Sequence, residues 1–428
     1  MDLTRQFDPP VTTVQDINFQ EKRFRPESGL SASSENTPYR FNVYPGPADV
    51  GGAYIDMAFI CQSAAGASIA TYATGTATSH TALRPDFFNS IFSRMEWGCD
   101  DYSETINLEQ HQWVVSMIED HLLQPESADS ANKTYPLDYV NGLRRITSET
   151  LTSTDFIDSN NAIIDGGSVC YLRLDLPTGC FFKNCTSLVD LPERTYMTLY
   201  LSSPAAMFVA GASVTISPVI SSISKMDLCI NYASGETVRR LYAGHVNARQ
   251  FISVPKFDIK HFTVASGDTT SILKSTIHYL PNHIYLVYRR AWSDAQSNRI
   301  FNFGNVKRAH LTINNSEPIG AFDNIVSNAD KSAVWEQLKK ATQNNLEGTV
   351  LTKTDMLDSL NSNIDNWTIY AFPVASYLQA QNAGTTYDCE VNVTYNSTAA
   401  IATTAYVIAC FNAVLTIDKS RNSISRLV

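Results

Sequence analysis

The side chains that most often do chemistry occur in this chain as a few isolated pairs. Asp100 and Asp101 are adjacent carboxylates, the groups that general acid–base catalysis often uses. Adjacent acids at the end of a strand usually point apart and cap a turn, so we interpret them as turn residues. His278 and His283 flank a Pro-Asn step and could form a histidine pair in a loop. No third metal ligand lies near them in the sequence, which favours two ordinary histidines.

Two more pairs could mark a binding site. Four residues separate Cys180 from Cys185, and no second Cys or His pair follows at the spacing of a zinc site. No signal peptide follows Met1, so we expect reduced thiols, and the sequence predicts buried free cysteines. Gly51-Gly52 lacks the pattern of a dinucleotide-binding loop, and we interpret it as a turn.

The motifs of common enzyme classes are absent from the sequence. It contains no Gly-x-Ser-x-Gly nucleophile elbow, no phosphate loop ending in Gly-Lys-Ser/Thr and no His-Glu-x-x-His zinc motif. The sequence therefore predicts no catalytic, cofactor-binding or metal-binding residues, no cofactor, and a protein that is not an enzyme. An enzyme stays open as the first alternative.

The elements that position these residues include a pattern that occurs twice. Residues 302–318 repeat the pattern of residues 88–104 at an offset of 214 residues, which aligns Arg94 with Arg308. In both copies apolar and polar residues alternate up to a polar turn, as expected for a strand with one buried face.

Each polar turn is followed by apolar residues at helical spacing. These residues are Leu108, Val115, Ile118 and Leu122 in the first copy, and Val334, Leu338 and Ala341 in the second. We therefore expect a strand-turn-helix unit in each half of the chain.

The composition fits a folded chain of two β-rich domains. Its 428 residues exceed the roughly 250–300 at which single cores stop growing. Apolar residues make up 44% and charged residues 17%, with many aromatic residues. The net charge of −10 disfavours binding to phosphate backbones. Lys22, Arg23 and Arg25 are an exception near the start, and we interpret them as part of a solvated tail.

Turn residues and short apolar runs divide the chain further. Residues 1–37 are rich in Pro and Ser and predict an extended arm. Short strand-like runs between Gly and Pro signals predict a first domain at 38–232, a connector at 233–249 and a second domain at 250–428. Two long polar excursions, at about 124–165 and 318–366, should lie on the surface.

Several fragments resemble one known family. They include Leu176-Pro-Thr-Gly-Cys-Phe-Phe-Lys-Asn, Leu191-Pro-Glu-Arg-Thr-Tyr-Met-Thr-Leu, Leu280-Pro-Asn-His-Ile-Tyr-Leu-Val-Tyr and Ile369-Tyr-Ala-Phe-Pro-Val. Their order along the chain is similar to that of the double jelly-roll major capsid proteins of tailless icosahedral DNA viruses. This group includes the adenovirus hexon lineage, large nucleocytoplasmic DNA viruses, virophages and Polinton-like elements. The chain is short for that family. Its length weakens the assignment to a particular viral group more than the assignment to the fold.

The resemblance implies a fold and a structural role. The fold is all-β, with two eight-stranded antiparallel jelly-roll β-sandwiches in tandem and short helices in loop insertions. The role is that of a major capsid protein whose homotrimers form pseudo-hexameric capsomers of an icosahedral double-stranded DNA virus shell. The chain would be located in the virion and assembled inside the host cell.

The same resemblance implies the partners. They are further copies of the chain, neighbouring capsomers, penton and minor or cement capsid proteins, with an internal membrane as a further candidate and no specific nucleic-acid binding. Two other functions stay open. One is a minor capsid or penton protein, and the other is a jelly-roll carbohydrate-binding module in which a tyrosine such as Tyr377 stacks on a sugar.

Overall fold

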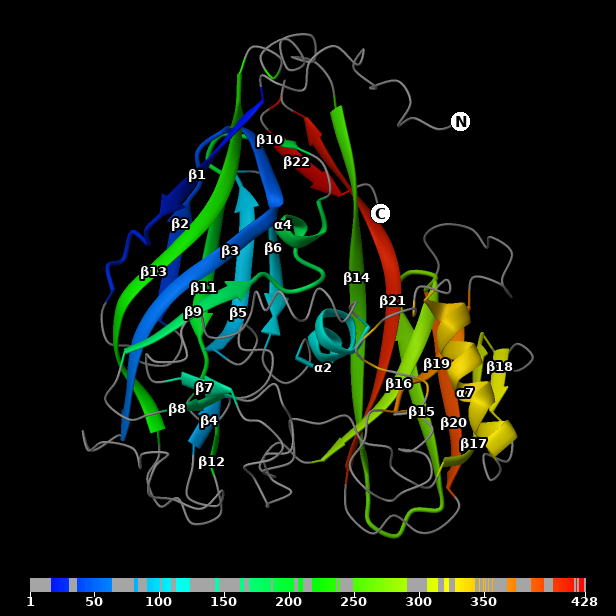
Figure 1. Cartoon of the computed structure of the whole chain (residues 1–428). Helices are drawn as coiled ribbons and strands as arrows, with labels where there is room; N and C mark the ends of the chain where they lie inside the picture. Colours follow the sequence, from blue (N-terminus) through cyan, green and yellow to red (C-terminus); the bar gives the residue numbers. More distant parts are fainter. Residues whose placement is uncertain are drawn as a thin grey trace.

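Figure 1 shows the computed structural model of the chain, which consists mainly of two β-sandwiches side by side. The structure describes residues 17–30, 37–63, 81–83, 91–100, 102–108, 113–123, 143–145, 162–164, 169–185, 188–203, 207–210, 218–235, 238, 249–290, 306–314, 319–322, 328–342, 346, 349, 351, 353, 356, 368–374, 386–395, 403–418, 421 and 423–426. Among them, no helix has the length and apolar content needed to cross a bilayer.

The first sandwich is built from two antiparallel sheets. Sheet A has the order β1-β13-β3-β10, and β9 also pairs with β3. Its strands are β1 (Asn18–Phe24), β13 (Pro218–Ser234), β3 (Gly46–Ser63), β10 (Val189–Leu191) and β9 (Val169–Asp175). Sheet B has the order β2-β11-β5-β6. Its strands are β2 (Pro38–Asn42), β11 (Tyr196–Leu201), β5 (Phe92–Cys99) and β6 (Tyr102–Asn107).

The second sandwich repeats this plan. Sheet D has the order β14-β21-β16-β19, and β22 also pairs with β21. Its strands are β14 (Arg249–Val264), β21 (Thr403–Asp418), β16 (His283–Arg290), β19 (Tyr370–Pro373) and β22 (Ser423–Arg426). Sheet E has the order β15-β20-β17-β18. Its strands are β15 (Thr270–Ile277), β20 (Tyr387–Tyr395), β17 (Val306–Ile313) and β18 (Ile319–Phe322).

Smaller elements lie in the connections between these strands. Sheet C, at the lower end of the first sandwich in Figure 1, consists of β12 (Phe208–Ala210), β4 (Thr81–Leu83), β8 (Ala162–Ile164) and β7 (Leu143–Arg145). The helical elements within the described residues include α2 (Trp113–Ser116), which continues as a π-helix over Met117–Leu122, α4 (Phe181–Asn184) and α7 (Asn328–Ala341). Of the two predicted excursions, the structure describes β7 and β8 in the first and β18 and α7 in the second, and most of the remaining residues lie outside the described ranges.

The two sandwiches match in register as well as in strand order. Arg94 lies opposite Tyr200 of β11, and Arg308 lies opposite Thr394 of β20. Those two partners in turn lie opposite the first residues of β2 and β15. The two arginines therefore occupy the same place in sheets B and E. This confirms the 214-residue repeat and the tandem all-β fold predicted from the sequence.

The predicted strand-turn-helix unit contains one more strand in each half. β6 follows the first turn and β18 follows β17, so a hairpin precedes each helical segment. In the first half Leu108 is helical directly after β6, and α2 begins at Trp113. Leu108 packs in the first core, whereas Val115 packs in the second. The spacing of apolar residues could not reveal that they face two different cores.

The two sandwiches exchange parts of their cores. Ile252 and Val254 of β14 pack in the core of the first sandwich, together with residues from the end of β21 and from β22. In return Val115 and Ile118, from the helical segment after β6, pack in the core of the second. The predicted domains at 38–232 and 250–428 stay predictions. Sheet A also contains β1 from the predicted arm and extends to Ser234, and side chains from each range complete the other core.

Gly51-Gly52 does not form the predicted turn. Both residues lie within β3, where the pairing with β13 shifts register between Cys229 and Asn231. A Cβ atom on Gly51 would lie 2.0 Å from the carbonyl oxygen of Cys185. Glycine is needed here because α4 and its C-terminal residue pack closely on the strand, which is a long-range contact that the sequence pattern does not report.

Candidate functional site

The described residues of the predicted arm include a strand that completes sheet A. β1 pairs antiparallel with β13 along its whole length, from Asn18 opposite Ser234 to Phe24 opposite Leu228. Phe24 is the one buried side chain of β1. Apolar burial therefore contributes little to the attachment of β1, and its polar contacts must contribute more.

A pair of buried acids lies beneath this strand. Asp56 of β3 and Asp227 of β13 are directly opposite each other, and they are 7% and 4% exposed. Like charges directly opposite on one face of a sheet repel, and buried carboxylates are costly without a cationic partner. The two carboxylates therefore need cationic side chains on this face of sheet A to offset their charge.

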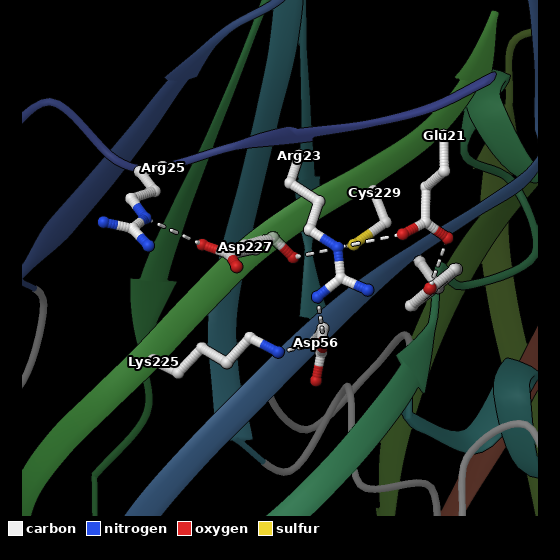
Figure 2. Close-up of polar contacts among 8 residues, drawn as sticks. Glu21, Arg23, Arg25, Asp56, Lys225, Asp227 and Cys229 are labelled. Carbon is white, nitrogen blue, oxygen red and sulfur yellow. Dashed lines mark hydrogen bonds and ion pairs between the residues drawn. The ribbon is translucent and has the colours of Figure 1, made fainter.

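Figure 2 shows that β1 and β13 supply that charge. The Arg23 guanidinium donates a hydrogen bond from Nη1 to Asp56 Oδ2 at 3.1 Å, and Lys225 Nζ contacts the same oxygen. Arg25 Nε lies 3.7 Å from Asp227 Oδ1. Two of the three cations come from the β1 segment, so the acids hold that segment to the sheet by ion pairing.

The neighbouring polar groups extend this cluster. Tyr54 donates a hydrogen bond from its hydroxyl to Glu21 Oε2 at 2.8 Å, and that bond lowers the pKa of Glu21. Glu21 also accepts a hydrogen bond from Arg23 Nε at 2.9 Å. Burial raises the pKa of the Cys229 thiol to about 11, which keeps it protonated near neutral pH and unsuited to nucleophilic attack. The cluster can fasten a strand, and it has no activated nucleophile.

The interpretation of Lys22, Arg23 and Arg25 as part of a solvated tail is wrong for this segment. Lys22 lies 4.8 Å from the ring centre of Tyr232, and the two arginines pair with acids of sheet A. The sequence of β1 lacks regular apolar alternation, and its acidic partners lie far away in the chain. Local pattern analysis therefore had no signal for this strand.

Removal of the Arg23 charge should weaken the attachment of β1. We expect Arg23→Gln to lower the free energy of unfolding by about 1 kcal/mol, since the arginine is half exposed and Lys225 remains on Asp56. Urea denaturation followed by circular dichroism measures this difference. Lys307→Gln, on an exposed position of β17, is the matched control and should change stability by less than about 0.5 kcal/mol. Equal losses in both variants would contradict the fastening role.

The structure separates the other candidate pairs. Asp100 lies in the turn after β5, as predicted, and accepts a hydrogen bond from Arg194 Nη1 at 2.9 Å, whereas Asp101 lies outside the described residues. His278 is exposed after β15, and His283 begins β16 with its Nε2 atom buried. The two histidines therefore have different environments.

Cys180 and Cys185 are buried free thiols, as predicted. They flank α4, and burial raises the pKa of both thiols to about 12. Among the described residues, no group of three or more His, Cys, Asp and Glu side chains is arranged to hold a metal ion.

Tyrosines on the outer face of sheet B are covered by arginines. The Arg40 guanidinium carbon lies 4.2 Å from the ring centre of Tyr196, and that of Arg94 lies 3.9 Å from the ring centre of Tyr200. A carbohydrate ligand stacks on such ring faces, so these two tyrosines offer it little free surface. Tyr377, the tyrosine singled out from the sequence, lies outside the described residues.

Polar contacts also join the two sandwiches. Lys256 of β14 donates a hydrogen bond from Nζ to the carbonyl oxygen of Gly179 at 3.0 Å and forms an ion pair with Glu104 of β6. The Gln250 side chain accepts a hydrogen bond from the backbone N–H of Asp190 at 3.1 Å. Together with the exchanged core residues, these contacts make the pair of sandwiches one structural unit.

Comparison with known structures gives matches over nearly the whole chain. The mavirus major capsid protein has 9% sequence identity and a TM-score of 0.59, over 98% of this chain and 92% of that chain. A chain of the Sputnik virophage has 12% identity and a TM-score of 0.59, over 98% and 90%. The Faustovirus major capsid protein has 8% identity and a TM-score of 0.50, over 96% and 93%.

The chain has the double jelly-roll fold. The structural matches over nearly the whole chain and the two register-matched sandwiches establish this, in agreement with the sequence expectation. No family model and no curated protein sequence matches the chain. At identities of 8–12% the double jelly roll is conserved in backbone arrangement while almost every side chain differs.

Proposed function

We propose that this double jelly-roll chain is a structural major capsid protein. Its homotrimers form pseudo-hexameric capsomers of an icosahedral double-stranded DNA virus shell. The observation that carries the proposal is the register-matched repeat of one sandwich within a single chain whose two sandwiches share core residues. The proteins with this fold that match over more than nine-tenths of their length include the major capsid proteins of mavirus and Faustovirus.

The repeat has a direct geometric consequence. Three chains related by a three-fold axis place six similar blocks around that axis. Such an assembly has a nearly hexagonal outline and can fill a six-coordinated lattice position. The sandwiches of residues 38–232 and 250–428 would alternate around the ring, and the exchanged core residues would keep each pair at a fixed angle.

The proposed role determines the partners. The chain binds further copies of itself, and its capsomers contact neighbouring capsomers, penton proteins and minor or cement proteins, with an internal membrane as a further candidate. Its place is the virion, after assembly inside the host cell. The β1 cluster supports a role without phosphate binding, because its cations already pair with Glu21, Asp56 and Asp227.

The trimer is the first testable consequence. Light scattering on the purified protein should give the mass of three chains of 47.4 kDa each. Negative-stain images should show particles of hexagonal outline. We expect each pair of chains to bury well over about 2,000 Å² of total surface, as in obligate assemblies. A single-chain mass at micromolar concentration would argue for a binding module or a penton-type protein instead.

A further inference from the structure

A helical segment of the first half covers one face of sheet D within the chain. Ile118, in the π-helix after α2, packs in the second core, and its neighbour Glu119 forms a hydrogen bond with Tyr285 of β16. The backbone N–H of Leu351 donates a hydrogen bond to the carbonyl oxygen of Leu122 at 2.9 Å, which fixes the end of the same segment. Figure 1 shows α2 between the two sandwiches. The contact between the halves therefore joins a helical segment that follows one hairpin to a sheet of the other sandwich.

Sheet A and α7 are the counterparts of these two surfaces in the repeat. Sheet A has the same strand plan as sheet D, and α7 follows the hairpin of β17 and β18 as α2 follows that of β5 and β6. The outer face of sheet A is the one that carries Asp56 and Asp227. Figure 1 shows sheet A and α7 at opposite sides of the chain, so the two counterparts do not meet within one chain. A second copy can bring them together.

Both counterpart surfaces expose side chains that suit a protein contact. Alternate residues of β1 point to the outer face, where Phe19 is 58% exposed, and the Arg25 side chain just after β1 is 84% exposed. Aromatic residues and arginine are enriched at protein interfaces. On α7, Ala333, Glu336 and Lys340 are exposed at helical spacing and form its free face. The exposed cation of Arg25 and the exposed carboxylate of Glu336 give the two surfaces complementary charges.

We infer that the outer face of sheet A binds α7 of the next copy in a three-fold ring. The inference rests on the proposed trimer and names the two surfaces that meet in it. Each chain gives α7 to one neighbour and sheet A to the other, and this head-to-tail contact closes after three copies. Phe19 packs over Ala333, whose small side chain leaves room for the aromatic ring. Arg25 pairs with Glu336 beside it.

Cross-linking between cysteines tests which surfaces meet. A chain with Arg25→Cys and Ala333→Cys should form covalent trimers with a short bismaleimide, because each copy is then linked to both neighbours. The six free cysteines among the described residues are buried, and the wild-type protein measures the background reaction. Arg25→Cys with Ile272→Cys is the control, since Ile272 is 61% exposed on β15, at the edge of sheet E opposite β18. The control should give no covalent trimers above background.

A second variant tests the contribution of Phe19. Phe19→Asp places a carboxylate where the aromatic ring contacts α7, and we expect light scattering at micromolar concentration to give the mass of a single chain. Its far-UV circular dichroism spectrum should equal that of the wild type, because Phe19 lies outside the core. Ile272→Asp makes the same kind of change at a side chain of similar exposure and should stay trimeric.

The results also separate this contact from the proposed trimer. A wild-type protein of single-chain mass would contradict the trimer and the contact together. A trimeric wild type whose Arg25→Cys and Ala333→Cys variant gives no covalent trimers would contradict the contact alone, and so would a trimeric Phe19→Asp variant. Covalent trimers from the first pair of cysteines, with none from the control pair, would support α7 on the outer face of sheet A.

Discussion

Replacing either Glu104 with Gln or Lys256 with Met should lower the free energy of unfolding by about 3–5 kcal/mol. The two side chains are 15% and 10% exposed and form an ion pair between β6 of the first sandwich and β14 of the second. Removal of one partner leaves the other charge buried without compensation. Because the stability of a domain is only about 5–15 kcal/mol, losses of this size should be plain in urea denaturation.

The double variant should behave differently from either single one. Glu104 Oε2 is buried and has no hydrogen-bond partner among the described residues, so the pair is incompletely satisfied. Replacing both residues with apolar ones of similar volume, Glu104→Leu with Lys256→Met, removes both desolvation costs at once. We expect the double variant to regain most of the stability that each single variant loses.

An exposed ion pair provides the control for this comparison of single and double variants. Lys274 and Glu390 pair across β15 and β20 at 2.7 Å, and the Lys274 side chain is 70% exposed. Lys274→Met should cost no more than about 1 kcal/mol. If Lys256→Met costs as little as Lys274→Met, the pair between the sandwiches contributes nothing beyond an ordinary surface contact, and the exchanged core residues alone hold the joint.

Features of this fold that depend on neighbouring residues could be predicted from the sequence, and features that depend on distant residues could not. Strand alternation is local, so the pattern around Arg94 and Arg308 predicted two strands whose register matches in the structure. The requirement for Gly51 arises from Cys185, and the attachment of β1 arises from Asp56 and Asp227. No local pattern reports such distant partners.

The joint between the sandwiches was missed for the same reason. β14 reads from the sequence as one strand of the second sandwich, yet Ile252 and Val254 pack in the first core and Lys256 pairs with Glu104. The sequence favoured an ordinary histidine at position 283 and gave no sign of its burial. Its burial beside Glu119 and Cys410 became visible only when both halves were placed together.

The acid stability of the protein should depend on His283. Burial lowers the pKa of this imidazole from 6.5 to about 4, so the folded chain keeps it neutral while the unfolded chain takes up a proton. The associated stability is complete above pH 6.5 and is lost as the pH falls to 4. This difference between the pKa values of the unfolded and the folded chain corresponds to about 3 kcal/mol of unfolding free energy.

A comparison of variants isolates this contribution from the carboxylates that titrate in the same range. His283→Gln cannot take up the proton, so its stability should fall less steeply than that of the wild type between pH 6.5 and 4, when both are measured at one protein concentration. His278→Gln removes an exposed histidine and should follow the wild-type slope. Tyr285 and Cys410 lie beside His283, Glu119 lines the same cavity between the sandwiches, and burial is the cause of the lowered pKa of the imidazole. Parallel curves for the wild type and His283→Gln would show that the imidazole is solvated in the folded protein.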